Sequence, residues 1–417
     1  MGKTIAHKII EAHADVDDVA VGDLVDVRPD WTLANDLSMY RGMHRMAELG
    51  HTQVARPDRV IVAFDHHVPS SDPTITAHMN EMRAWIGEHG ISHFYDEGDG
   101  ILHNIVAEEG FALPGQLIIG SDSHTTTHGA FGMLSTGISH TDLGEALGAG
   151  ELWLRVPQTR RVHIEGSLSG GASAKDLGLA IMGELTASLA LSEAIEFVGP
   201  AVSALEMHER STLSNFAVEL GAQTGIIPAD EVTETYLDGR AYEPYEPVVA
   251  DADATYVDEH VLDAAAVEPL VAAPPAVDNI APVRAVAGTA VDQVFVGTCN
   301  NSRFEDIAAF AAILDGETVA RGTRLIVVPG SRAAAAQMAA TGITEQIIAA
   351  GGMVSPPGCG PCFGAHGGLL SEGEVCVGTM NRNFPGRMGP GDIYLASPET
   401  AAAAAIYGAI TDPREVA

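Results

Sequence analysis

The amino-acid sequence predicts an α/β protein of three domains, with parallel-rich sheets flanked by helices. With 417 residues the chain exceeds one ordinary hydrophobic core, so two or three domains are expected. Short apolar runs indicate buried parallel strands over Val60–Phe64, Leu117–Ile119, Val294–Val296, Leu325–Val328 and Val375–Val377. Helical patterns lie between such runs, for example over Thr74–Glu88, Asp142–Leu154, Asp306–Leu314 and Arg332–Ala340.

The expected domains cover residues 1–162, 163–283 and 284–417. The first boundary is placed near Arg160–Gly171, where the sequence starts a new strand and turn. The second follows residues 260–290, which are rich in Ala, Pro and Val with weak periodicity and are typical of an interdomain linker. The third domain then contains all four cysteines.

Composition and charge exclude several classes of protein. Hydrophobic residues make up 46% of the chain, which favours a globular protein. The formal charge of −34 repels phosphate backbones and opposes binding to nucleic acid; its simplest explanation is a surface adapted to high salt or a GC-rich genome. No apolar run is long enough to span a bilayer. The first 14 residues indicate an amphipathic helix and not a signal peptide, so a cytoplasmic protein with no membrane partner is expected.

Polar and reactive residues directly follow four of the predicted strands. Ligands bind at the carboxyl ends of strands in open α/β sheets, so four such strand ends indicate one shared active site. The four segments are Asp65-His66-His67, Gly120-Ser121-Asp122-Ser123-His124, Gly297-Thr298-Cys299-Asn300-Asn301 and Gly378-Thr379-Met380-Asn381-Arg382.

The cysteines indicate a metal centre. Cys359 and Cys362 form a C-x-x-C pair, Cys299 lies 60 residues upstream at a strand end, and Cys376 lies inside an apolar strand as a buried, inert thiol. Spacing alone also allows structural zinc, with Cys376 or His366 as a fourth ligand, or a redox pair. Three thiolates on a four-iron cluster would leave one iron open to a substrate hydroxyl and carboxylate.

Seven motifs in order along the chain resemble the aconitase superfamily, and most closely the large subunits of 3-isopropylmalate dehydratase, homoaconitase and dimethylmalate dehydratase. The motifs are DHHVP from 65, GILHN from 100, GSDSHTTTHGAFG from 120, LSNFAVELGA from 213, GTCNNSR from 297, PGCGPC from 357 and NRNFPGRMG from 381. The resemblance implies three α/β domains of the aconitase large-subunit type around a central cluster.

The resemblance also implies site residues. A [4Fe–4S] cluster would be held by Cys299, Cys359 and Cys362, with one iron not ligated by cysteine. Carboxylate-held histidines are tunable proton donors near neutral pH, and His67 competes with His66 for one such role. His128 and His140 are interpreted as structural. The implied catalytic pairs are Asp65–His66, His103–Asp122 and His124–Glu219.

Substrate contacts are expected from Ser123, Asn215, Asn381, Arg382 and Arg387. The two arginines follow a strand end in a chain with few cations, and a guanidinium pairs with a carboxylate bidentately. Two departures from the family pattern stand out. The usual Cys-Thr-Asn reads Cys299-Asn300-Asn301, which alters the hydrogen bonds available to sulfur. A run that touches substrate in relatives corresponds here to Ala34–Met39, which leaves substrate identity open.

The resemblance implies a hydro-lyase that dehydrates, hydrates or isomerises a 2-hydroxy di- or tricarboxylate, with 3-isopropylmalate of leucine biosynthesis as the first expectation. Homoaconitase, 2-methylmalate or 2,3-dimethylmalate dehydratase and aconitase are alternatives. The chain ends shortly after its third expected domain, so a small subunit is expected to form a heterodimer with it and to carry the swivelling domain and catalytic serine. A zinc-stabilised, non-catalytic binding protein is the alternative of another class.

Overall fold

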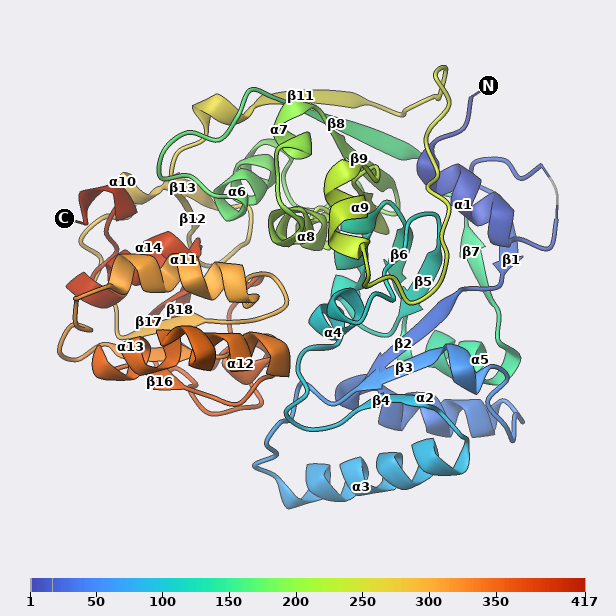
Figure 1. Cartoon of the computed structure of the whole chain (residues 1–417), viewed down its shortest axis with the longest axis horizontal. Coiled ribbons are helices and arrows are strands. Elements are labelled where there is room, and N and C mark those ends of the chain that lie inside the picture. The colour runs from blue at the N-terminus through green and yellow to red at the C-terminus, as the bar shows by residue number, and fades with distance from the viewer. Residues whose placement is uncertain (1, 17, 417) are drawn as a thin grey trace.

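The computed structural model describes residues 2–16 and 18–416 as an α/β protein with helices packed on largely parallel sheets (Figure 1). The predicted fold class is confirmed. In the view of Figure 1 the first large sheet lies at the lower right, the second at the top and the third at the left. Within the described part of the chain, no helix is both long enough and apolar enough to cross a bilayer.

The first sheet has five parallel strands in the order β4-β3-β2-β5-β6. Helix α2 is capped by Asn35, whose side chain accepts from the backbone N–H of Ser38 and closes a capping box. A separate antiparallel ribbon pairs β1 (Leu24–Val27) with β7 (Leu152–Arg155). The strands and helices of this region are β2 (Trp31–Asn35), β3 (Val60–Ala63), β4 (His93–Tyr95), β5 (Leu117–Gly120), β6 (Leu134–Gly137), α1 (Ile5–His13), α2 (Asp36–Glu48), α3 (Pro73–Glu88), α4 (Leu102–Glu108) and α5 (His140–Ala149).

The second sheet has four parallel strands in the order β10-β9-β8-β11. Helices α6 and α8 pack on each other beside it, so residues from both reach the interior of the molecule. The elements are β8 (Thr159–Glu165), β9 (Ala194–Val198), β10 (Thr224–Ile226), β11 (Glu259–Asp263), α6 (Ala174–Leu185), α7 (Pro200–Ser203), α8 (Met207–Asn215) and α9 (Glu231–Leu237).

The third sheet has seven strands in the order β13-β12-β18-β17-β14-β15-β16. Its last five strands run parallel, whereas β12 is antiparallel to both of its neighbours. The elements are β12 (Leu270–Ala272), β13 (Ile280–Pro282), β14 (Gln293–Val296), β15 (Arg324–Val327), β16 (Met353–Val354), β17 (Val375–Gly378), β18 (Asp392–Ala396), α10 (Val283–Val286), α11 (Phe304–Leu314), α12 (Arg332–Thr341), α13 (Ile343–Ala349) and α14 (Pro398–Tyr407).

The linker interpretation of residues 260–290 was wrong. This segment contains β12, whose three residues are buried, and β13, which extends the third sheet at its edge. Short strands of Ala, Val and Pro carry too few residues for a visible period, and proline is tolerated at a sheet edge. The sheets therefore divide near residue 270, and the expected boundary at 162/163 falls within β8.

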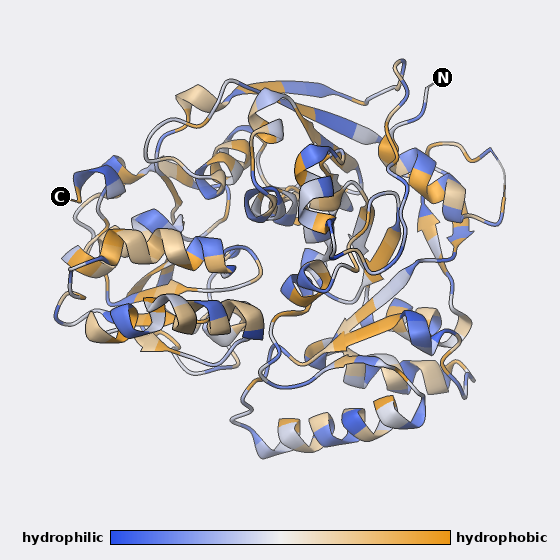
Figure 2. Ribbon diagram, in the orientation of Figure 1, coloured by the Kyte–Doolittle hydropathy of each residue, from blue (hydrophilic) through white to orange (hydrophobic). Residues whose placement is uncertain are grey.

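The helix predicted over 142–154 is shorter than expected. Helix α5 ends at Ala149 because Gly150 adopts a left-handed conformation with φ of 76°, which caps the helix. The following residues form β7 instead. The five predicted strands are confirmed to within one residue at each end. Their apolar side chains are buried, and Figure 2 shows the strands of the first sheet among the most hydrophobic segments of the ribbon.

Candidate active site

Residues that follow strands of two different sheets meet in one small cavity of about 30 Å³. Asp65 and Asp122 follow β3 and β5 at the carboxyl edge of the five-stranded sheet. Cys299 and Asn381 follow β14 and β17 at the carboxyl edge of the seven-stranded sheet. Parallel sheets present their functional loops at this edge. The cavity thus lies between the carboxyl edges of two sheets.

A larger hollow of about 950 Å³ lies between helices α4, α8, α9, α11 and α12. It is lined by residues such as Met207, Tyr236 and Arg303, and it includes none of the cysteines. The smaller cavity holds three cysteines together with buried carboxylates and histidines, so chemistry and not volume identifies the candidate site.

Three of the four cysteines line the cavity, and their thiols are buried and free of disulfide bonds. Cys359 caps a tight 3₁₀ turn, and Cys362 lies within that turn. Cys299 lies in the loop after β14. Cys376 instead lies wholly buried in β17, where burial raises the pKa of its thiol to about 12. The cavity therefore offers three thiols, and Cys376 belongs to the sheet core.

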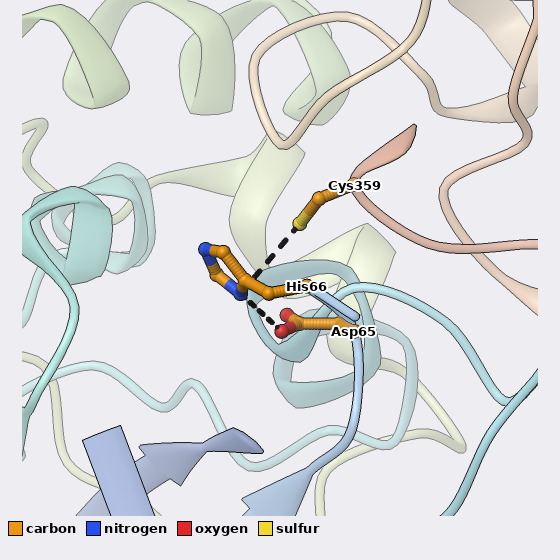
Figure 3. Close-up of side chains that lie close together, drawn as sticks. All are labelled: Asp65, His66 and Cys359. Atoms are coloured by element: carbon orange, nitrogen blue, oxygen red, sulfur yellow. Dashed lines mark hydrogen bonds and ion pairs between the residues drawn. The ribbon is translucent and has the colours of Figure 1, made fainter. Parts of the chain in front are cut away.

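Asp65 and His66 form the first carboxylate–histidine pair (Figure 3). Asp65 Oδ1 lies 2.6 Å from His66 Nδ1, and its Oδ2 accepts from the backbone N–H of Leu102 at 2.8 Å. Burial disfavours a charged imidazole, but the neighbouring Cys359 sulfur and Asp65 carboxylate outweigh it and raise the pKa of His66 well above its ordinary value. His66 Nε2 faces Asp122 Oδ2 at 3.7 Å. His66 thus connects the cysteine turn to the acid–base groups.

A backbone hydrogen bond joins the two halves of the site. The N–H of Cys359 donates to the carbonyl oxygen of Asp65 at 2.8 Å. Gly358, which precedes this cysteine, approaches the same carbonyl so closely that a Cβ would lie 3.1 Å from it, and its φ is 155°. A side chain at Gly358 would therefore strain the turn and separate the loops.

Asp36 holds the loop after β3 from below. Its two oxygens accept the backbone N–H groups of Asp65, His66 and His67 at 2.8, 2.9 and 2.9 Å. His67 Nδ1 also lies 2.7 Å from the Asp36 carboxylate. Burial opposes ionisation, but the hydrogen bond with His67 and the charge of His66 lower the pKa of Asp36 to about 2. His67 is thus engaged by Asp36, and His66 is the residue of this pair that reaches the cavity.

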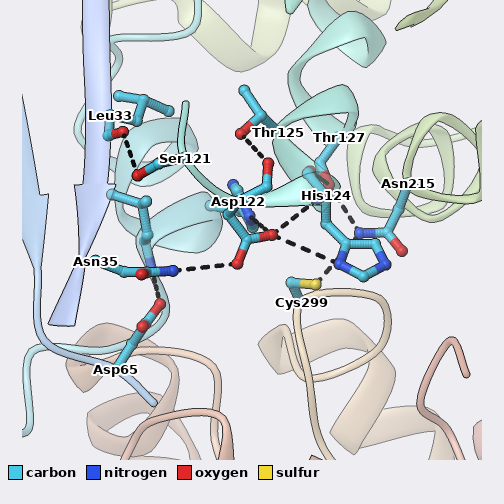
Figure 4. Close-up of polar contacts among 12 residues, drawn as sticks. Leu33, Asn35, Asp65, Ser121, Asp122, His124, Thr125, Thr127, Asn215 and Cys299 are labelled. Atoms are coloured by element: carbon cyan, nitrogen blue, oxygen red, sulfur yellow. Dashed lines mark hydrogen bonds and ion pairs between the residues drawn. The ribbon is translucent and has the colours of Figure 1, made fainter. Parts of the chain in front are cut away.

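Asp122 is shared by two histidines (Figure 4). Its Oδ1 lies 3.2 Å from His103 Nε2 and 3.6 Å from His124 Nδ1, and it accepts the backbone N–H of His124 at 2.8 Å. Asn35 Nδ2 donates to Oδ2 at 3.1 Å. Despite burial, the two histidines lower the pKa of Asp122 well below its ordinary value. Asp122 is therefore an anion whose charge favours protonation of the imidazoles of His103 and His124.

His124 and Glu219 form the third pair. His124 Nε2 lies 3.0 Å from Glu219 Oε1, and Arg382 Nε donates to the same oxygen at 2.8 Å. Burial would raise the pKa of Glu219, but His124 and Arg382 lower it. Arg382, expected to clamp substrate, thus already bonds a protein carboxylate through Nε.

N–H donors point at two of the cavity sulfurs. Asn215 Nδ2 and Asn381 Nδ2 lie 3.3 and 3.5 Å from Cys299 Sγ, and Arg387 Nη2 lies 3.4 Å from Cys362 Sγ. Such donors stabilise thiolates more than thiols. Asn381 Oδ1 and Arg387 Nε are buried without a partner among the described residues, although both side chains line the cavity. These orphaned atoms indicate that the cavity is built to receive a polar ligand.

The donor set fits a sulfur-ligated iron cluster. Asp65, His66 and Cys359 also place one ligand atom each within 4.8 Å of one another, a set that could hold a single metal ion. Asp65 already uses one oxygen on His66 and the other on a backbone amide, which leaves this set poorly disposed for a metal. Neither Cys376 nor His366, the expected fourth ligands for zinc, lines the cavity. Three soft thiolates with N–H donors match iron–sulfur ligation instead.

The remaining predicted residues are also placed. Ser123 starts the 3₁₀ helix after Asp122 and is half-buried. His140 is exposed at the start of α5. His128 is fully buried, its Nε2 lies 3.3 Å from His103 Nδ1, and burial lowers its pKa well below the ordinary value. His128 is thus buried against a site residue, although the sequence indicated only a structural role.

Sequence reasoning assigned no site role to Lys175, and it marked Ala34–Met39 without identifying the contacts of Asn35 and Asp36. Asn35 ends β2 and Asp36 follows it directly, so the strand-end pattern would have found them had Trp31–Asn35 been identified as a strand. Lys175 is 1% exposed in the first turn of α6, next to Asp176, and it is one of three lysines in the chain. The scarcity of lysine in the chain is a signal that could have marked it.

The fold and cavity define an α/β enzyme in which buried thiols and carboxylate-held histidines share one site. The model of the aconitase family (aconitate hydratase) matches residues 7–408. The chain is 47% identical to the probable methanogen homoaconitase large subunit of Methanosarcina mazei, covering 94% of this chain and 100% of the relative. It is 45% identical to 3-isopropylmalate dehydratase large subunit 1 of Methanopyrus kandleri, covering 99% of each.

This chain belongs to the aconitase family and is a hydro-lyase of the 4.2.1 type. Membership implies an iron–sulfur cluster. A further relative, the 3-isopropylmalate dehydratase large subunit of Hydrogenobaculum, is 40% identical over 100% of this chain and 99% of its own length. The crystal structure of Thermococcus kodakaraensis aconitase X matches with a TM-score of 0.53 at 13% identity, covering 85% of this chain and 84% of that one, and it supports the fold alone.

Proposed function

We propose that this chain is the large, cluster-bearing subunit of a [4Fe–4S] hydro-lyase that acts on a 2-hydroxy di- or tricarboxylate, with 3-isopropylmalate as substrate. The observation that carries the proposal is the single cavity lined by three buried thiols and by residues of all three carboxylate–histidine pairs. Proton transfer and metal ligation then act on the same bound molecule.

Cys299, Cys359 and Cys362 would hold the cluster, and the iron that no cysteine ligates would supply a Lewis acid for the substrate hydroxyl and its adjacent carboxylate. Cys359 and Cys362 share one tight turn, so their sulfurs are presented together. Asn215, Asn381 and Arg387 would keep their N–H groups on the sulfurs. Asn381 Oδ1 and Arg387 Nε, which have no partner among the described residues, would then bind substrate.

The histidines would move the proton that the departing hydroxyl needs. His66, His103 and His124 line the cavity, and each has a ring nitrogen near a carboxylate oxygen, at 2.6, 3.2 and 3.0 Å respectively. A paired imidazolium is a donor whose pKa can be matched to neutral pH. We assign His124, held by Glu219, as the first candidate for general acid, since Arg382 keeps that carboxylate ionised.

Charge balance requires cations for the substrate carboxylates. Arg387 lines the cavity, and its Nε is buried without a partner among the described residues. Arg382 donates to Glu219 through Nε. We propose that Arg387, Arg382 and Ser123 bind substrate carboxylate oxygens, which would answer how so acidic a protein holds an anion.

A small subunit would complete the enzyme. The relatives from Methanosarcina mazei and Methanopyrus kandleri are named large subunits, and this chain covers their full length. We propose that the partner supplies the swivelling domain and the serine that removes the proton from carbon. The pair would work in the cytoplasm, and this chain alone would be inactive.

The substrate assignment has one rival with direct support. The Methanosarcina mazei relative is named a homoaconitase, at an identity similar to that of the isopropylmalate dehydratases. The two substrates differ chiefly in one arm, an isopropyl group against a carboxylate chain. The departures at Ala34–Met39 lie beside Asp122, where Asn35 contacts the carboxylate.

The test is anaerobic co-purification with a cognate small subunit, followed by turnover of 3-isopropylmalate, homoaconitate, 2-methylmalate, 2,3-dimethylmalate and citrate. We expect a brown complex that turns over 3-isopropylmalate fastest and is inactive without the partner. A colourless, zinc-containing protein would overturn the cluster assignment. A brown enzyme that prefers homoaconitate would overturn only the substrate.

A further inference from the structure

A buried lysine lies behind the cluster cysteines. Lys175, in the first turn of α6, is 1% exposed, and its Nζ donates to Asn300 Oδ1 at 2.6 Å. The same ammonium group donates to the backbone oxygens of Thr379 and Met380 at 2.9 and 2.7 Å. All three acceptors are neutral oxygens, and three acceptors require the protonated amine, which has no directly bonded carboxylate. Burial opposes this charge and lowers the pKa of Lys175 to about 7.

The two carboxylates nearest to this charge are engaged elsewhere. Asp176 accepts from the backbone N–H of Leu270 at 2.8 Å and from Ser173 at 2.9 Å. Asp306 accepts from Asn301 at 2.9 Å. Neither carboxylate accepts a hydrogen bond from the lysine among the described residues. Burial lowers the pKa of Lys175, and the charges of Asp306 and of the Cys299 sulfur both oppose that lowering.

Amide groups connect the lysine to a cluster sulfur. Asn300 Nδ2 donates to Asn215 Oδ1 at 2.8 Å, and Asn215 Nδ2 donates to Cys299 Sγ at 3.3 Å. Asn381 Nδ2 donates to the same Asn215 oxygen at 3.1 Å. Lys175, Asn300, Asn215 and Asn381 are all buried, so no water competes along this path.

The direction of each amide is fixed by its neighbours. An ammonium group only donates, so the oxygen of Asn300 must face Lys175. The backbone oxygen of Thr212 lies 3.3 Å from Asn300 Nδ2, and a reversed amide would set two oxygens against each other there. Asn215 must then turn its oxygen to Asn300 and its N–H groups to Cys299 and Thr127.

We propose that Lys175, acting through Asn300 and Asn215, is a positioning group that polarises the N–H bond on Cys299 and raises the reduction potential of the cluster. The inference rests on the proposed cluster function. Chained hydrogen bonds strengthen one another, and both net charge and N–H···S bonds set cluster potentials. The position where this chain departs from the family's Cys-Thr-Asn is the middle member of the path, because Asn300 offers an oxygen to the lysine and an N–H group to Asn215 at once.

The test compares three variants of the anaerobic large subunit by redox titration followed by electron paramagnetic resonance, with iron content and circular dichroism. Lys175→Met removes the charge at similar length, and Asn300→Ala cuts the path while keeping the charge. Leu177→Val, a buried position on the same helix, serves as the matched control. We expect the potential to fall in both path variants, further in Lys175→Met, and a chelator to strip iron about 10- to 100-fold faster.

Leu177→Val should lower thermal stability and leave the potential unchanged. An unchanged potential in both path variants with an intact cluster would overturn the proposal. A shift in Lys175→Met alone would also overturn it, because the charge would then act without Asn300. If Lys175→Met does not fold, Asn300→Ala against the control decides the question. Failure of the unaltered chain to bind a four-iron cluster would instead overturn the proposed function.

Discussion

The two walls of the cavity are organised in opposite ways. On the side of the five-stranded sheet, the groups are ionisable and held by charge: Asp36, Asp65, Asp122 and their histidines. On the opposite side, neutral amides of Asn381, which follows β17, and of Asn215, at the end of α8, face the sulfur of Cys299. Proton transfer needs groups that change charge, whereas thiolate ligands need donors that do not. Variants of the ionisable side should therefore lower kcat, whereas variants of the cysteine side should lower the iron content.

Replacement of a cavity cysteine should have the largest effect. Cys299→Ser removes one of three sulfur anchors, so we expect loss of both iron and turnover in a folded protein. Iron analysis and visible absorption of the anaerobically purified subunit measure this. Cys376→Ala is the matched control, since that thiol lies in the sheet core and should leave the iron content unchanged. Equal loss of iron in both variants would show that the fourth cysteine is also a ligand.

Replacement of a histidine on the opposite wall should lose rate and keep metal. His124→Gln removes the imidazole on Glu219, and we expect kcat to fall about 10²- to 10⁴-fold with the iron content of the unaltered enzyme. Steady-state kinetics of the two-subunit complex, with iron measured on the same sample, tests this. His140→Gln, at an exposed position, is the control and should retain full activity. A fall in iron equal to the fall in rate would contradict the division between the walls.

Asp36, on the same side of the cavity as these histidines, should contribute to folding stability. Asp36→Asn leaves a buried site without its charge, and we expect the free energy of unfolding at pH 7 to fall by about 3 kcal/mol. The pKa of Asp36 is lowered from 3.8 to about 2 in the folded chain. The lowered pKa means that ionised Asp36 contributes about 2 kcal/mol to the free energy of unfolding. This part of the stability is fully present above about pH 4 and is lost as the pH falls towards 2.

Urea unfolding of Asp36→Asn and the unaltered chain between pH 7 and pH 2.5 measures this difference. The gap between the two proteins should narrow below about pH 4. A constant gap over the whole range would mean that the carboxylate charge makes no contribution to stability.

The smallest effect is expected at Asn35. Asn35→Ala removes the cap of α2 and one donor to Asp122, so we expect a loss of about 1 kcal/mol in unfolding free energy and a modest fall in kcat. Thermal unfolding and steady-state kinetics measure both. Asn35→Ser keeps a capping oxygen but lacks the N–H donor to Asp122, so it should recover stability and not rate. Recovery of both would show that the contact with Asp122 is irrelevant to turnover.

The sequence predicted the strands and the residues that follow them because those signals are local. A strand that ends in Asp65 or Cys299 carries its chemistry in adjacent residues, and parallel pairing brings such ends to one edge. Helix 142–154 was overextended because Gly150 ends it through a backbone conformation that apolar periodicity does not reveal. The contacts of Asp36 and Lys175 were missed because their partners lie 29 and 125 residues away in sequence. Interactions of that range depend on how the sheets face each other.

The hydrogen bond between the Cys359 amide and the Asp65 carbonyl has a consequence for biosynthesis. It joins positions separated by almost three hundred residues, so a growing polypeptide cannot close this site until nearly all of it has left the ribosome. Iron donors would therefore meet a finished chain, and nascent or truncated products would expose unprotected sulfur.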